Sequence, residues 1–164
     1  MLRVLVAVFA GILAVTAPLA PAAAGDAPAA SELLDRAAIQ NLVVKYTIAL
    51  DTLDADLYAS VFAEDAEFTF GGNTYRGRAE IRKIVTGLQE RNAKQPADAP
   101  KSYHVLSNTY VELLNDHEAR HRSYWQTIRG PSSGPFTVGG MGRYEDTLVK
   151  RDGEWLILER RIIQ

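Results

Sequence analysis

The spacing of apolar residues changes partway along this chain, from a helical period to an alternating one. Apolar side chains recur every three or four positions through residues 31–51, whereas apolar and polar residues alternate in 66–70 and through much of 102–163. The first pattern gathers apolar side chains on one face of a helix, and the second gathers them on one face of a sheet. Helices followed by strands predict an α+β domain, with the helices packed on one side of a curved antiparallel sheet.

Three helices are predicted in the first part of the chain. The first begins at Ser31, a residue type that caps helices, and ends near Asp51. The second begins after Asp54 and ends near residues 63–65, and the third covers roughly residues 79–91. The first two helices therefore meet close to Asp51.

The rest of the chain predicts strands joined by short turns. A Gly-Gly-Asn turn at residues 71–73 joins two strands into a hairpin before the third helix. Four longer strands follow and form an antiparallel meander. A segment rich in glycine and proline, residues 129–140, is predicted as a loop beside the pocket mouth. The four predicted strands are 102–114, 118–128, 141–150 and 154–163.

The first 24 residues have the pattern of a secretory signal peptide. Arg3 precedes the apolar run 4–17, and small residues follow at 22–24. We expect residues 25–30 to form a disordered lead-in and residues 31–164 to form one domain. The sequence contains no cysteine, which together with export favours a bacterial periplasmic or secreted location and excludes disulfides. After cleavage no segment is long and apolar enough for a membrane span.

The charge pattern argues against nucleic acid as a partner. Without Arg3 the chain has 17 basic and 20 acidic residues, spread over both halves, whereas a nucleic-acid site needs clustered Lys and Arg. Three isolated histidines without ligand spacing predict no metal site, and we expect no cofactor. We therefore expect a small-molecule or protein partner, and as substrate a hydrophobic small molecule.

Asp51 and His104 are the main candidates for chemistry. A carboxylate can orient an imidazole and stabilise its charge, so the pair could transfer protons near neutral pH without a cofactor. Each residue also has a simple structural explanation. Asp51 could close a helix, and His104 could be a hydrogen-bonded core residue of a strand.

The order of short motifs resembles the SnoaL-like branch of the NTF2-like superfamily. Single motifs are weak, but their order and spacing together cover nearly all of the expected mature chain. The resemblance implies a cone-shaped α+β barrel with a deep pocket, and it implies the fold more firmly than a reaction. The motifs are residues 38–42, Tyr46, 50–51, 62–65, 77–78 with Ile81, His104 with Asn108, 123–125, 142–144 and 153–155.

Within this superfamily the functional parallel is scytalone dehydratase. Its pocket Asp falls on Asp51 and its first pocket His on His104. The paired tyrosines that polarise the substrate carbonyl in that enzyme fall on Leu50 and Phe70, and the region of its second catalytic His gives Ile128. The resemblance therefore implies a similar Asp/His pair with a different substrate.

Further candidates would bind the substrate around this pair. Tyr46, Asn108 and His121 are expected to bind a departing or developing oxygen, with Tyr46 and His121 counted among the catalytic candidates. Alternation in 118–128 does not show which face is inward, so His121 could line the pocket or lie on the opposite face. Aromatic side chains that could stack on the substrate are Phe70, Tyr58 and Trp125.

These observations predict a cofactor-independent lyase of the dehydratase or isomerase type. Its substrate would be a hydrophobic, hydroxylated aromatic or cyclic molecule, and the leaving group would be water or a one-carbon fragment. The alternative is a non-catalytic ligand-binding or assembly module. The resemblance also implies a homodimer or higher oligomer through the outer sheet face, where Arg120, Arg122 and Tyr124 would suit an interface.

Overall fold

A computed structural model describes residues 26–131 and 134–164, so the predicted signal peptide lies outside the described residues. Helix α1, Asp26–Thr52, ends where the sequence predicts but begins five residues before Ser31. Ser31 is therefore inside the helix and is not its cap, and most of the predicted lead-in is helical. Proline at residue 28 is compatible with this start, because the backbone N–H groups in the first turn of a helix have no hydrogen-bond partner within the helix.

Helix α2, Ala55–Ser60, begins as predicted, with the Asp54 carboxylate accepting a hydrogen bond from the backbone N–H of Leu57 at 2.9 Å. It ends earlier than predicted, because strand β1, Phe62–Phe70, begins at once. Phe62 is fully buried and pairs with Ile157 of the last strand. Pairing in the sheet therefore overrides the local helical pattern in this segment.

Strand β1 forms the predicted hairpin with β2, Asn73–Arg76. Helix α3, Arg78–Asn92, follows within one residue of its predicted bounds at each end. Ile81 and Val85 are its buried residues, and both have no exposed surface. The helix packs against α2 and the β1–β2 hairpin.

Four long strands complete the sheet and confirm the predicted meander. The strand order is β2-β1-β6-β5-β4-β3, so the sheet curves without closing and has β2 and β3 as its edges. Every neighbouring pair is antiparallel except β1 and β6, which are parallel. The long strands are β3, Lys101–Leu113, β4, Glu118–Gly130, β5, Thr137–Arg151, and β6, Glu154–Ile163.

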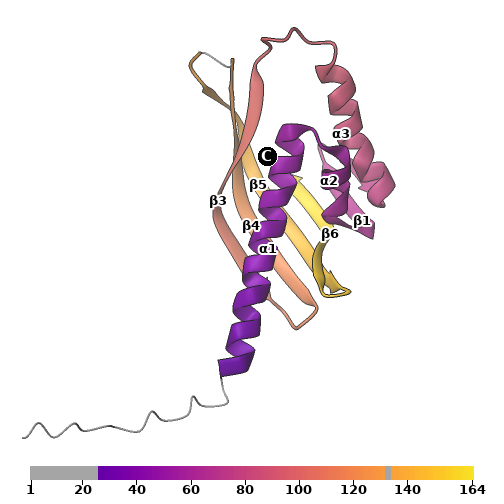
Figure 1. Cartoon of the computed structure of the whole chain (residues 1–164), viewed down its shortest axis with the longest axis vertical. Helices are drawn as coiled ribbons and strands as arrows, with labels where there is room; N and C mark the ends of the chain where they lie inside the picture. The colour runs from indigo at the N-terminus through magenta and orange to yellow at the C-terminus, as the bar shows by residue number, and fades with distance from the viewer. Residues whose placement is uncertain (1–25, 132–133) are drawn as a thin grey trace, which may run out of the picture.

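The helices lie on one face of the sheet, with α1 crossing in front of it and α2 and α3 beside it (Figure 1). Helix α1 contacts β3 and β6, and the core fills the space between them. This arrangement confirms the predicted α+β fold. No helix in residues 26–131 and 134–164 is both long and apolar enough to cross a membrane.

Candidate functional site

The end of helix α1 fixes the position of Asp51. Leu53 follows the helix with a φ of 57°, and its N–H bonds to the carbonyl of Leu50 at 3.3 Å. The N–H of Asp54 bonds to the carbonyl of Ala49 at 2.8 Å. These two bonds form a Schellman motif, which closes the helix and reverses the chain directly after the last turn that carries Asp51.

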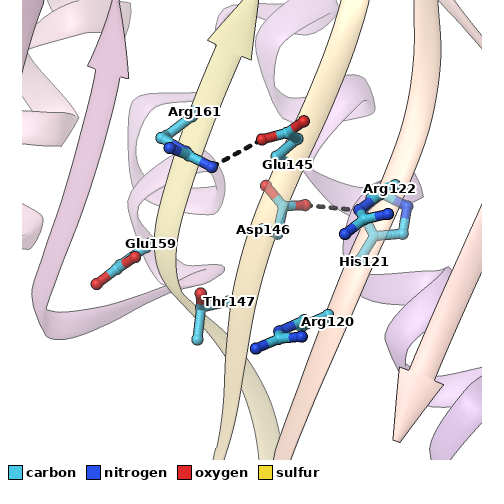
Figure 2. A pocket seen from close by; sticks show the side chains of 8 residues that line it. All are labelled: Arg120, His121, Arg122, Glu145, Asp146, Thr147, Glu159 and Arg161. Atoms are coloured by element: carbon cyan, nitrogen blue, oxygen red, sulfur yellow. Dashed lines mark hydrogen bonds and ion pairs between the residues drawn. The ribbon is translucent and has the colours of Figure 1, made fainter.

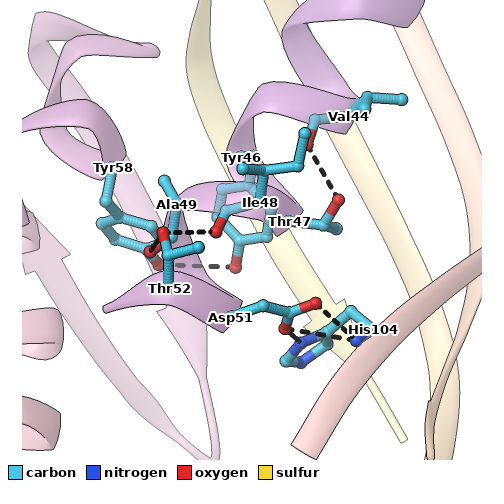
Figure 3. A network of polar contacts seen from close by, with 9 residues as sticks. All are labelled: Val44, Tyr46, Thr47, Ile48, Ala49, Asp51, Thr52, Tyr58 and His104. Carbon is cyan, nitrogen blue, oxygen red and sulfur yellow. Dashed lines mark hydrogen bonds and ion pairs between the residues drawn. The ribbon is translucent and has the colours of Figure 1, made fainter. Parts of the chain in front are cut away.

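Asp51 contacts both the side chain and the backbone of His104 (Figure 3). One carboxylate oxygen, Oδ1, lies 2.6 Å from Nδ1 of the imidazole. The backbone N–H of His104 donates to Oδ2 at 2.9 Å and to Oδ1 at 3.2 Å. The carboxylate therefore links α1 to β3 and sets the orientation of the imidazole ring.

The pair lies at the edge of the protein interior, since each of the two side chains is 16% exposed. The Trp125 ring is 6.4 Å from the His104 ring, measured between centroids. When Nδ1–H donates to Asp51, Nε2 of His104 presents its lone pair, and no described residue forms a hydrogen bond with it. The geometry is suited to proton transfer at Nε2.

A second Asp/His pair lies deeper on the same face of the sheet. Oδ2 of Asp146 lies 2.7 Å from Nδ1 of His121 (Figure 2), and Arg160 donates to the same carboxylate through Nε at 2.7 Å and Nη2 at 2.6 Å. The side chains of all three residues have no exposed surface. They are direct neighbours across β4, β5 and β6.

Burial disfavours charge on Asp146 and Arg160, but each supplies the opposite charge that the other needs. Burial alone would raise the pKa of the Asp146 carboxyl, but the charge and hydrogen bonds of Arg160 and the hydrogen bond from His121 lower it below its ordinary value. The carboxylate in turn holds the pKa of Arg160 above its usual range. The cluster is therefore a buried ion pair with an imidazole attached.

The guanidinium of Arg160 also packs against aromatic rings. Its central carbon lies 3.9 Å from the centroid of the Tyr46 ring and 4.5 Å from that of Tyr144. The hydroxyl of Tyr58 donates to that of Tyr46 at 3.3 Å. Burial raises the pKa of all three tyrosines, so their hydroxyls stay protonated near neutral pH.

Two of the substrate-binding candidates, Asn108 and Phe70, lie outside this interior. Asn108 is exposed with a φ of 50°, at a register shift between Ser107 and Tyr110, which interrupts the alternation that would have turned it inward. Phe70 is 40% exposed and pairs with Asn73 at the end of the hairpin. Neither residue forms part of the site around His104.

The remaining candidates lie inside the protein. Tyr46 and Tyr58 are each 1% exposed, Trp125 is 7% exposed, and His121 is fully buried. The face of β4 that the sequence left open is thereby settled, with His121 and Trp125 on the inner face.

Arg120, Arg122 and Tyr124 are exposed on the opposite face of β4. A hollow of about 310 Å³ lies between β4, β5 and β6 and is lined mainly by charged side chains of this outer face (Figure 2). It contains neither Asp51 nor His104, and the outer face is therefore separate from the site around that pair.

Sequence reasoning missed Arg160 as part of the interior. Trp155 and Ile157 of β6 are buried, so regular alternation would place residue 160 outside. Opposite β6, the register shifts between Thr147, which pairs with Glu159, and Leu148, which pairs with Ile157. This bulge turns Arg160 inward, and alternation alone gives no sign of it.

The described residues hold no group of three or more His, Asp or Glu side chains that could bind a metal ion. The polar groups gathered on the inner face of the sheet are the two Asp/His pairs, the tyrosine hydroxyls and Arg160.

Comparisons with known proteins place this geometry in a family. No curated protein matches the sequence. A protein of unknown function from Mycobacterium tuberculosis shares 26% identity over 84% of this chain and 76% of its own, with a TM-score of 0.71. A proposed scytalone dehydratase from Novosphingobium aromaticivorans shares 25% identity over 83% of this chain and 89% of its own, with a TM-score of 0.67.

An NTF2-like protein with a cystatin-like fold, also from Novosphingobium aromaticivorans, has a TM-score of 0.73. It shares 24% identity over 87% of this chain and 89% of its own, which shows likeness of fold alone. The model of the SnoaL-like domain matches residues 31–161, which is most of the sequence. The chain therefore belongs to the SnoaL-like domain family, within the NTF2-like fold.

Proposed function

We propose that this protein is a cofactor-independent lyase that uses Asp51 and His104 as an acid/base pair. The observation that carries the proposal is the 2.6 Å contact between Oδ1 of Asp51 and Nδ1 of His104, at a partly exposed edge of the interior. The proposed substrate is a hydrophobic ring compound with a carbonyl group and a hydroxyl group on the carbon β to it, and the reaction is elimination of water.

The position of Asp51 in α1 supports a functional role. A carboxylate in the last turn of a helix is disfavoured by about 0.3–1 kcal/mol, because the carbonyl ends carry partial negative charge. The two backbone contacts and the ring contact with His104 offset this cost. A residue chosen only to end the helix would be expected to be neutral or basic.

The mechanism follows from the free nitrogen of His104. Nε2 removes a proton from a carbon next to a carbonyl group, and the electron pair of that C–H bond moves onto the carbonyl oxygen to give an enolate. Asp51 stabilises the imidazolium that forms. The enolate re-forms its carbonyl, a carbon–carbon double bond forms, and the C–O bond to the hydroxyl breaks. The imidazolium gives its proton to the departing hydroxide, so that water leaves and His104 is regenerated.

The structural relatives add support of a coarser kind. One of them is a proposed scytalone dehydratase, and another is a proposed aromatic-ring hydroxylase, at 27% identity over 80% of this chain and 89% of its own with a TM-score of 0.64. The first name concerns a dehydration, and the second concerns hydroxylation of an aromatic ring. The interior of this chain offers stacked aromatic side chains beside the pair, among them Trp125 and Tyr144.

The test is turnover of hydroxylated cyclic ketones and aromatic compounds by the purified protein, followed by mass spectrometry for loss of water. The wild type is compared with Asp51→Asn and His104→Ala. We expect turnover in the wild type only. Equal turnover in all three proteins would overturn the proposal, and binding without turnover in the wild type would favour a ligand-binding module instead.

A further inference from the structure

The proposed elimination needs hydrogen-bond donors that the Asp51–His104 pair does not supply. Negative charge develops on a substrate oxygen when His104 removes a proton, and such an oxygen is stabilised by fixed donors. The carboxylate of Asp51 only accepts hydrogen bonds. The backbone N–H of His104 is already bonded to Asp51, and its ring nitrogens are used for orientation and proton transfer. The donors must come from another part of the interior.

The inner face of the sheet holds a group of buried polar atoms without a protein partner. Among the described residues, no hydrogen bond is formed by Nε1 of Trp125, Oγ of Ser123, Nη1 of Arg160 or Nε2 of His121. Leaving a buried polar atom unpaired lowers stability, so a cluster of them calls for an explanation.

The two tryptophans of the chain differ in whether the indole N–H has a hydrogen-bond partner. Nε1 of Trp155 donates to Oδ1 of Asp35 at 2.8 Å, as is usual for a buried indole, whereas Nε1 of Trp125 has no partner among the described residues. Ser123 and Trp125 are neighbouring inward-facing residues of β4. The partner of Ser123 in register on β5 is Tyr144. The unpaired donors of Ser123 and Trp125 therefore lie on one face of one strand.

These donors lie beside an aromatic wall, which consists of the stacked rings of Trp125 and Tyr144 and begins next to His104. The ring of Trp125 lies 6.4 Å from that of His104 and is stacked on Tyr144 at 5.9 Å. The guanidinium of Arg160 lies 4.5 Å from the Tyr144 ring, at the far side of the wall. A flat ring lying against Trp125 could place its reacting carbon toward His104 and the neighbouring oxygen toward the unpaired donors.

We propose that Trp125 Nε1–H and Ser123 Oγ–H bind a carbonyl or phenolic oxygen of a flat cyclic substrate, with the charge of Arg160 behind them. This inference rests on the proposed function for the position of the reacting carbon at His104. Solvent reaches the Asp51–His104 pair but not the unpaired atoms. Binding at the donors therefore requires the side chains that cover them to move apart.

The test follows the two indole N–H signals of uniformly ¹⁵N-labelled protein by NMR. Trp155→Phe assigns the signals, since the chain has two tryptophans. The probe is 2-naphthol, and 2-methylnaphthalene is its match in shape without the oxygen. We expect 2-naphthol to shift the Trp125 indole proton downfield and to leave that of Trp155 in place. The methyl analogue should cause no downfield shift.

Ser123→Ala separates binding from packing. Because Oγ has no partner among the described residues, its loss should leave the unfolding midpoint unchanged or higher. The same variant should bind 2-naphthol about tenfold more weakly, the loss expected for one hydrogen bond. Trp155→Phe is the matched control, and we expect it to lower stability while 2-naphthol binding stays at the wild-type level.

His104→Ala distinguishes failure of this inference from failure of the proposed function. It should abolish turnover and still show the downfield shift of the Trp125 signal. The inference is overturned if 2-naphthol does not bind, if both probes shift the Trp125 indole alike, or if Ser123→Ala binds 2-naphthol as tightly as the wild type. A shift with no turnover of any substrate would support the oxygen site and count against the lyase proposal.

Discussion

The carboxylate of Asp51 accepts hydrogen bonds from the backbone N–H of His104 while its Oδ1 lies 2.6 Å from the ring nitrogen Nδ1. One side chain thus fixes the position of β3 relative to helix α1 and also the orientation of the imidazole. Its chemical and structural roles can be separated by a substitution that keeps its shape.

Asp51→Asn is expected to lower turnover by about 10²–10⁴-fold with little loss of stability. The amide oxygen can still accept the backbone N–H of His104. If the amide group donates to Nδ1, the ring proton moves to Nε2, which then cannot take a proton from the substrate. The ¹⁵N shifts of the imidazole report this change of tautomer. An unchanged tautomer together with wild-type turnover would contradict the prediction.

The buried pair of Arg160 and Asp146 predicts a large and coupled effect on stability. Arg160→Leu leaves an unpaired buried carboxylate and should lower the free energy of unfolding by about 3–5 kcal/mol in urea denaturation. Adding Asp146→Leu should restore a large part of that loss, because the unpaired charge is removed. The exposed pair of Arg76 and Glu67 is the control, since Arg76→Ala should cost at most about 1 kcal/mol. Additive losses in the double variant would contradict the proposed coupling.

Gly142 lies directly under the ring of Trp125, and its replacement tests how tightly this wall is packed. A Cβ at residue 142 would meet the backbone carbonyl of Ile163 and lie 2.9 Å from the indole ring. Gly142→Ala should therefore lower the free energy of unfolding by about 1–3 kcal/mol and displace Trp125. Gly87→Ala in α3 is the matched control, since its Cβ meets nothing closer than 3.6 Å, and it should raise stability by up to about 1 kcal/mol. Thermal unfolding of both variants measures the difference.

The fold could be predicted from the sequence because its main signals are local. Periodicity predicted α1 and α3, and alternation with short turns predicted the meander from β3 to β6. The start of β1 at Phe62 could not be predicted, since its strand conformation depends on a parallel partner in β6 that is far away in the sequence. Long-range pairing of this kind leaves no local pattern.

The candidate site could be predicted only in part, for the same reason. The sequence and the family resemblance pointed to Asp51 and His104, which the structure brings into contact. The inward position of Arg160 and the outward position of Asn108 were not predicted, because irregularities of register in β3 and between β5 and β6 reverse the side-chain alternation. A bulge adds one residue and turns every later side chain to the other face.

The lowered pKa of Asp35 predicts how the free energy of unfolding changes at acid pH. Hydrogen bonds from Lys150 at 2.6 Å and Trp155 at 2.8 Å lower the pKa of its carboxyl below the ordinary value. The stabilisation is therefore fully present above the unfolded pKa of about 3.9 and is lost as the pH falls through the lower folded pKa. Asp35→Asn should be less stable than the wild type at pH 7, and the difference should shrink below about pH 4.

Urea unfolding between pH 7 and pH 2 measures this difference for Asp35→Asn. Asp56→Asn is the control, because Asp56 is highly exposed in its ion pair with Arg82 and should leave the wild-type profile unchanged. A constant difference between the wild type and Asp35→Asn across this range would contradict the linkage.

We propose that the outer sheet face binds a second copy of the chain. Tyr124 is 51% exposed and Met141 is 67% exposed there, beside a hollow where Arg120, Arg122 and Arg161 alternate with Glu145 and Glu159. A face that combines apolar groups with both signs of charge can be self-complementary about a twofold axis.

Light scattering after size exclusion at micromolar concentration should show a dimer, and Tyr124→Glu should give a monomer because it buries an unpaired charge at the contact. Ile48→Glu is the matched control, since Ile48 of α1 is also 51% exposed but lies on the helical side of the molecule, and it should remain a dimer. A wild-type monomer, or loss of the dimer in Ile48→Glu alone, would reject this interface.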